Sequence, residues 1–273
     1  MRSMLTSISL GVLSLGLGLG PAFAGSAALL PHRAVYDLSL KEASERSGIN
    51  NMVGRMVYEF NGSACDGYTV SFRFVTEIDT GEAVRIADQQ TTTYENVRDR
   101  TFNFITKSYV NESLDHEIKG KAALDGEDLK VEIDKPSKLV IDLPAARFPT
   151  AHMMELIDKA KDGQQFYQSR IFDGSDEADE ALITTTVLGK LQAAMSVDAE
   201  TTAAKSLAEK DFWPVSISYF NEKNKDDGIP IYSIAFKLYE NGITRDLTMD
   251  YGDFSLTGKL ADLKLFEPAP CAQ

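Results

Sequence analysis

The chain has 273 residues, with 28 basic and 41 acidic side chains and a formal net charge of −13. Nucleic acid and anionic lipid headgroups are poor partners for so acidic a surface, because like charges repel. No cluster of Lys and Arg in the sequence provides a local exception. The composition therefore argues against a nucleic-acid-binding function.

The N-terminus predicts export. Arg2 precedes the uncharged stretch Leu5–Gly20, and Ala22-Phe23-Ala24 has the small-x-small pattern of a signal peptidase site. The stretch is short for a membrane span, which needs about 20 residues. We therefore expect a cleaved signal peptide over residues 1–24, a single β domain over residues 25–273, and no transmembrane segment in the mature chain.

The first half of the mature chain predicts strands. In residues 68–76, apolar and polar side chains alternate, which indicates one buried and one solvated face. Asn-Gly and Asp-Gly dipeptides between such segments predict tight turns, because both residue types tolerate positive φ. The other strands expected here are 35–40, 53–60, 84–94, 101–106, 114–122 and 129–133.

One segment changes to helical spacing. Thr150 is placed to cap a helix over residues 151–161, and Asp162-Gly163 is placed to end it. We expect its apolar stripe at the concave face or mouth of the sheet, where it either fills the interior or walls a ligand pocket. Filling is the simpler of the two readings. The helical candidates for lining such a pocket are Met153, Leu156 and Ile157.

The last third returns to strands, at 166–172, 182–188, 215–220, 231–240, 243–251 and 254–266, with a hairpin at Asn241-Gly242. Residues 190–210 are rich in Ala, Ser, Thr, Glu and Lys and are expected to form a variable surface segment, as a short helix pair, an ordered surface loop or a partly disordered stretch. Trp213 stands at a strand start and is the fourth candidate pocket residue, although packing in the core or rim is the simpler role. So many antiparallel strands must curl or close to protect their edges. The predicted fold is mainly β, a large curled antiparallel sheet with one helix.

The two cysteines, Cys65 and Cys271, both lie in the exported part. An oxidising compartment favours a disulfide between them; the alternatives are two free thiols or a metal site. With three histidines and no paired Cys or His spacing, the sequence predicts neither a metal nor a cofactor. A disulfide that closes a loop of about 200 residues would stabilise the fold by about 5 kcal/mol in the chain-entropy model.

Catalytic patterns are missing from the mature sequence. No G-x-S-x-G elbow occurs, and His32, His116 and His152 stand in contexts typical of structural or exposed histidines. The sequence therefore predicts no catalytic residue and a protein that is not an enzyme. A cell-wall hydrolase remains the enzymatic alternative.

Several short motifs occur in a fixed order: Pro31-His32-Arg33-Ala34-Val35-Tyr36-Asp37-Leu38, Gly54-Arg55-Met56, Cys65-Asp66-Gly67-Tyr68, Phe148-Pro149-Thr150-Ala151-His152, Phe172-Asp173-Gly174-Ser175, Trp213-Pro214-Val215 and Cys271. With them, nearly all of the mature chain resembles the envelope integrity protein B family of alphaproteobacterial periplasmic proteins. The order of the motifs and the two cysteines are the specific part of the resemblance.

The resemblance implies an open barrel or β-spiral with a helix in or near its mouth, a Cys65–Cys271 disulfide, and a periplasmic location. It also implies a role in envelope integrity and stress resistance without known catalysis. Our leading hypothesis is a non-enzymatic protein that binds an envelope protein, a lipid or a cell-wall component. The alternative is a carrier of a lipid or lipoprotein tail, held between the sheet and helix 151–161. We expect the disulfide to join the turn after strand 53–60 to the C-terminal tail, and so to anchor the outer end of the curled sheet.

Overall fold

The computed structural model describes residues 29–175, 178–194, 197–222, 228–268 and 271. The predicted signal peptide, residues 1–24, lies outside the described residues. In the described part, strands dominate and helices are few and short. None of these helices is long and apolar enough to cross a membrane.

The strands form one antiparallel sheet, and most coincide with segments of alternating side chains. They are β1 (His32–Ala43), β2 (Asn51–Ser63), β3 (Gly67–Asp79), β4 (Val84–Asn96), β5 (Thr101–Val110), β6 (Ser113–Asp125), β7 (Asp128–Lys135), β8 (Leu139–Pro144), β9 (Phe166–Ile171), β10 (Leu182–Leu188), β11 (Trp213–Asn221), β12 (Tyr232–Leu238), β13 (Thr244–Asp250) and β14 (Phe254–Leu265). The predicted hairpin at Asn241-Gly242 joins β12 to β13, and Gly242 has the positive φ of 84° that favours glycine.

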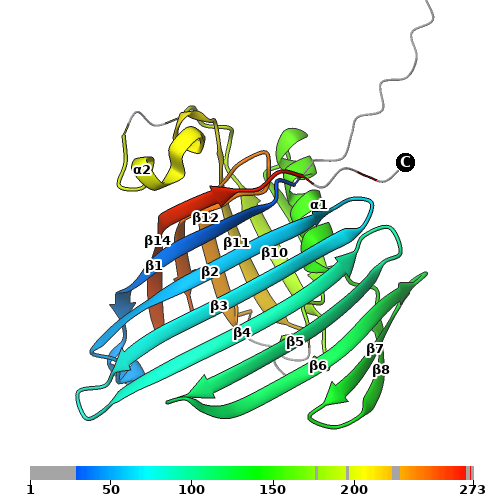
Figure 1. The fold of residues 1–273 in the computed structure, drawn as a ribbon, viewed down its shortest axis with the longest axis horizontal. Helices are drawn as coiled ribbons and strands as arrows, with labels where there is room; N and C mark the ends of the chain where they lie inside the picture. The colour runs from blue at the N-terminus through cyan, green and yellow to red at the C-terminus, as the bar shows by residue number, and fades with distance from the viewer. Residues whose placement is uncertain (1–28, 176–177, 195–196, 223–227, 269–270, 272–273) are drawn as a thin grey trace, which may run out of the picture.

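The order of the strands decides the shape of the molecule. It runs β8-β7-β6-β5-β4-β3-β2-β1-β14-β13-β12-β11-β10-β9, so the first and last strands are neighbours and the edges are β8 and β9. Figure 1 shows β1 to β6 as a front wall with β10 to β12 behind it. The sheet therefore curls back on itself without closing, which confirms the predicted curled antiparallel sheet.

One strand was not predicted. β8 contains the unbroken apolar run Leu139-Val140-Ile141 and follows the cis peptide bond Lys135–Pro136. Such a short run has no two-residue alternation, which was the signal used for the other strands. β8 pairs along its length with β7 and forms one edge of the sheet.

Two hydrophobic clusters fill the curl. The larger joins side chains of β1, β2 and β10 to β14 with the helix α1 (Pro149–Lys161), and the smaller lies under β5 to β8. In the smaller cluster the ring of Phe102 stacks 5.1 Å from that of Phe148 and meets Phe172 edge-on at 6.4 Å. The residues that precede α1 and follow β9 are thus packed against the opposite wall of the sheet.

Residues 190–210 are more than a surface segment. They contain the short helix α2 (Thr201–Ala204) and the 3-10 helix η2 (Lys205–Glu209); a further 3-10 turn, η1 (Glu45–Ser47), follows β1. Ala204, Leu207 and Ala208 are buried in the larger cluster. Part of the segment is therefore integrated into the core, and the short helical elements correspond to the helical alternative for this segment.

Candidate functional site

The N-terminus of α1 is held by a buried carboxylate from the sheet. Glu95 of β4 is 1% exposed, and its two oxygens accept the backbone N–H groups of Thr150 at 2.6 Å and Ala151 at 2.9 Å. The N-terminal N–H groups of a helix otherwise have no partner, and a negative charge there complements the helix dipole. Burial raises the pKa of Glu95, and the two hydrogen bonds partly oppose that rise.

This arrangement corrects the predicted cap. The N-cap residue is Phe148, without a side-chain cap, and Thr150 lies inside the helix. Glu95 is distant in sequence, and no local pattern connects it to the helix, so sequence reasoning missed it. The predicted C-terminal end is confirmed, because Asp162 is the C-cap and Gly163 follows with a φ of 73°.

The predicted pocket-lining face of α1 is packed against the sheet. Ile157 is 0% exposed and Leu156 is also fully buried, and both belong to the larger hydrophobic cluster. Met153 is half-buried against the same cluster. The helix therefore fills the space beside it with these side chains.

Trp213 meets α1 at the opposite end of the helix from Glu95. It is largely buried and, with Ala160, lines a shallow hollow of about 270 Å³. The remaining lining residues are Lys161, Gly163, Gln164, Gln165, Gly189, Lys190 and Leu191. Of the four candidate pocket residues, the structure thus places Trp213 in a surface hollow and Met153, Leu156 and Ile157 against the core.

Polar side chains of α1 face β9 and the segment before the helix. Glu155 accepts hydrogen bonds from Ser169 at 2.9 Å and from Arg147 at 2.8 Å. His152, one turn earlier on the helix, is buried, and its Nε2 atom has no hydrogen-bond partner among the described residues. Burial lowers the pKa of His152 to about 4, with a smaller raising effect from Glu155.

The lowered pKa of His152 predicts that the stability of the fold depends on pH. Below pH 6.5 the unfolded chain binds a proton at His152, whereas the folded chain resists it until about pH 4. The free energy of unfolding should therefore fall as the pH drops from 6.5 to about 4, by up to about 3 kcal/mol from this one group. Above pH 6.5, His152 is neutral in both states and causes no such loss. His152→Gln should remove this part of the pH dependence, measured by urea unfolding at pH 7, 5.5 and 4. The carboxylates titrate in both proteins, so curves that stay parallel would refute the prediction.

The other two histidines lie on strands of the sheet. His32 is buried against Tyr58 and Phe60, and its Nδ1 atom lies 2.7 Å from the carbonyl oxygen of Leu30. His116 lies on β6, within a strand as predicted. Within the described ranges, no group of three or more His, Cys, Asp or Glu side chains could hold a metal ion.

A buried ion-pair network fixes the segment before α2. Arg245 of β13 lies 3.0 Å from Glu200 and 2.5 Å from Asp198, and the side chains of Arg245 and Glu200 are both 2% exposed. Glu200 also accepts the backbone N–H groups of Asp246 and Leu260. The network ties residues 198–200 to β13 and β14. No sequence pattern predicted this network, because its partners are some 45 to 60 residues apart along the chain.

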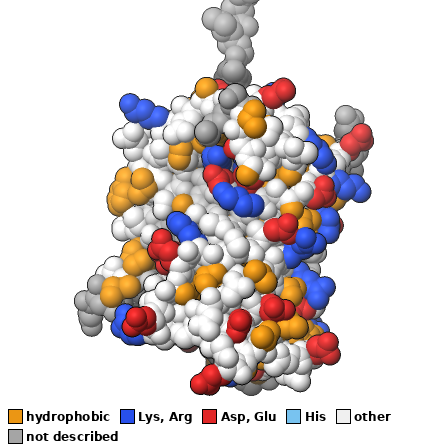
Figure 2. Space-filling view, turned by 90° about the vertical axis from the view of Figure 1, so that its left-hand side faces the viewer, with side chains coloured by type: hydrophobic (Ala, Val, Ile, Leu, Met, Phe, Trp, Pro, Cys, Tyr) orange, Lys and Arg blue, Asp and Glu red, His pale blue; other side chains and the backbone are white. Residues whose placement is uncertain are grey.

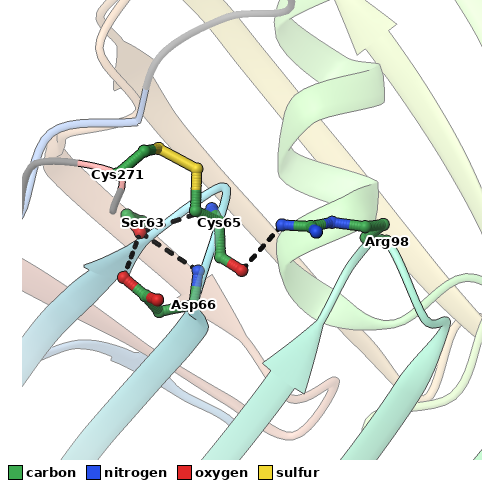
Figure 3. The surroundings of a disulfide bond; sticks show 5 residues. All are labelled: Ser63, Cys65, Asp66, Arg98 and Cys271. Carbon is green, nitrogen blue, oxygen red and sulfur yellow. Dashed lines mark hydrogen bonds between the residues drawn. A yellow bond between two sulfur atoms is a disulfide. The ribbon is translucent and has the colours of Figure 1, made fainter. Parts of the chain in front are cut away.

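The disulfide joins Cys65 to Cys271, with the Cα atoms 5.6 Å apart (Figure 3). Ser63 donates to the carboxylate of Asp66 and accepts the N–H groups of Cys65 and Asp66, while Arg98 donates to the carbonyl oxygen of Cys65. The predicted connection between the turn after β2 and the C-terminal tail is confirmed. The expectation that it anchors the outer end of the sheet is wrong, because β2, β1 and β14 lie in the middle of the strand order.

The surface has no broad apolar face on the side that Figure 2 shows. Hydrophobic side chains there form small groups separated by acidic and basic ones. Exposed ion pairs also join neighbouring strands of the sheet, such as Arg55 with Asp37 and Arg73 with Asp88.

An unclosed, curled antiparallel sheet with a helix packed inside it and a disulfide-tied tail defines a beta-barrel-like protein. The chain belongs to the EipB-like family, whose model matches residues 23–267. It is 52% identical over 250 residues to the cell envelope integrity protein EipB of Brucella abortus (strain 2308). The aligned region covers 91% of this chain and 89% of the relative.

A solved structure supports the same assignment. The crystal structure of a beta-barrel-like protein from Brucella abortus is 51% identical, with a TM-score of 0.86, and the match covers 88% of this chain and all of that one. The family that the sequence motifs indicated is thereby confirmed, and so is its open, barrel-like fold.

Proposed function

We propose that this protein supports the integrity of the cell envelope as a non-enzymatic periplasmic protein that binds an envelope component. The observation that carries the proposal is the 52% identity to a protein named for cell envelope integrity, which extends over nearly the full length of both chains. The disulfide fits an oxidising compartment outside the cytoplasm. The predicted signal peptide would direct the chain there.

The packing of α1 favours this proposal over a carrier of lipid or lipoprotein tails. Ligand pockets typically have volumes of about 300–1,000 Å³ and are largely apolar. The hollow at Trp213, of about 270 Å³, lies just below this range, and lysine and glutamine side chains share its lining with Trp213, Leu191 and Ala160. On the face of α1 that would contact an acyl chain, Leu156 and Ile157 are already in the core. A lipid recovered by mass spectrometry from natively purified protein would reverse this preference.

A deletion strain tests the envelope role. We expect deletion to increase sensitivity to detergent and to cell-wall antibiotics, and to leave sensitivity to a ribosome-targeting antibiotic unchanged. A plasmid that encodes the full chain should restore resistance, whereas one that starts at residue 25, without the predicted export signal, should not. Growth of the deletion strain like its parent in every condition would contradict the proposal. If the deletion strain is sensitive and the full chain restores resistance, cross-linking in the periplasm of the complemented strain would identify the bound component.

A further inference from the structure

The two edges of the open sheet are finished differently. At the β9 edge, the N–H group of Arg147 donates to Arg170 at 2.8 Å, and the N–H group of Phe172 donates to Arg147 at 2.8 Å. Ser169 of β9 also donates to Glu155 of α1. The segment after β8 and the helix thus cover part of this edge.

The β8 edge has no such cover. Within the described ranges, the backbone of residues 139–144 is hydrogen-bonded only through the ladder with β7. Figure 1 shows β8 next to β7 at the lower right margin of the molecule, at the end of the strand order. Unpaired N–H and C=O groups along a strand edge are a template for another strand.

The side chains of β8 are unusually apolar for an uncovered edge. Val140 is 60% and Leu139 is 49% exposed, while Ile141 and Leu143 are half-buried against the smaller hydrophobic cluster. Exposed edges in soluble proteins are usually protected by charges or by twisting away. Within β8, Asp142 is the single charged side chain. A strand added here would continue the hydrogen-bond ladder and extend the smaller cluster.

The length of the β8 edge and the net charge of the chain indicate which kind of partner strand would pair with this edge. Six residues provide about 20 Å of edge. Pairing with the same strand of a second copy would bury far less than the roughly 1,200 Å² of a stable dimer interface. Two copies that each carry a net charge of −13 would also repel each other. A short extended segment avoids both costs, because its backbone and alternate side chains supply the contacts.

We propose that β8 is a strand-addition site, which takes an extended segment of a partner polypeptide with apolar residues at alternate positions. The proposal deepens the binding role proposed above and rests on it, since it names the class of envelope component. Affinity would come from the backbone ladder, and specificity from side chains next to Leu139, Ile141 and Leu143.

A fluorescent probe peptide of alternating Thr and Val residues tests this with purified full-length mature protein. Fluorescence anisotropy should show saturable binding, and hydrogen exchange should show new amide protection confined to residues 139–143. The same peptide N-methylated at alternate amides on one edge should bind at least about ten-fold more weakly, because it cannot complete the ladder. Val140→Lys should weaken binding about ten-fold, since a charged side chain blocks edge pairing.

Val53→Lys is the matched control. Val53 is 42% exposed, but it lies on β2, which is paired on both sides. This variant should bind the peptide like the wild type, and equal thermal unfolding of both variants excludes misfolding as the cause. No binding, equal binding of the N-methylated peptide, or protection elsewhere would overturn the proposal. A peptide-independent dimer that Val140→Lys dissolves would also overturn it, in favour of a second copy. The envelope role is tested separately in cells, so either proposal can fail alone.

Discussion

Reduction of the Cys65–Cys271 disulfide is expected to lower the free energy of unfolding by about 5 kcal/mol. The bond closes a loop with a sequence separation of 206 residues, and the chain-entropy model gives this figure for so long a loop. For a chain of this size the loss corresponds to a fall of about 10–20 °C in melting temperature. Cys65→Ser, Cys271→Ser and the double variant should show the same loss, because each removes the same single bond.

The structure also predicts where the reduced protein opens. Without the disulfide, the N–H group of Cys65 still donates to Ser63 and its carbonyl oxygen still accepts from Arg98, while Tyr94 donates to the carbonyl oxygen of the neighbouring Asp66. The tail after β14 loses its covalent attachment. Limited proteolysis should therefore remove the tail first and leave the turn intact. Equal melting temperatures with and without reductant, or free thiols in the exported protein, would refute the prediction.

Arg245→Met is expected to destabilise the protein by about 3–5 kcal/mol. The substitution preserves much of the side-chain volume but leaves the carboxylate of Glu200 buried and without its cation. Thermal unfolding should shift by about 10 °C. Because Glu200 also accepts the N–H groups of Asp246 and Leu260, the loosening should include residues 198–209. Hydrogen exchange over α2 and η2 would detect it.

An exposed ion pair on the same sheet provides the control. Arg55 lies 2.7 Å from Asp37, but both side chains are more than half exposed. Arg55→Met should therefore cost less than about 1 kcal/mol. Adding Glu200→Gln to Arg245→Met should recover part of the lost stability, because the unpaired charge is removed while an acceptor for the backbone remains. Equal losses for Arg245→Met and Arg55→Met would show that burial of the pair has no energetic consequence.

The carboxylate of Glu95 at the N-terminus of α1 and the buried side chains of the helix hold it in place. Glu95 accepts the N-terminal N–H groups of the helix, the role that the sequence had assigned to the side chain of Thr150. Ile157 inserts into the core on the inner face of the helix. The helix is therefore an integral part of the folded interior. Leu156 and Ile157 therefore pack in the core, whereas Leu139 and Val140 of β8 are exposed at an edge of the sheet.

Local signals in the sequence were sufficient for much of the fold. Alternation within segments such as 68–76 predicted strands, and the dipeptide Asn241-Gly242 predicted a hairpin, because side-chain period and turn conformation depend on adjacent residues. The helix at 151–161 was found for the same reason. β8 was missed because Leu139-Val140-Ile141 has no alternation.

By itself, the sequence determined the fold class and the family, since these depend on local pattern and on the order of the motifs, and the family resemblance implied the connection between Cys65 and Cys271. Only the tertiary structure decided that β1 pairs with β14, that Glu95 caps α1, that Arg245 meets Glu200, and that β8 is left at an edge. These features join residues that are far apart along the chain. Their energies come from burial and desolvation in the completed fold, which no local stretch of sequence records.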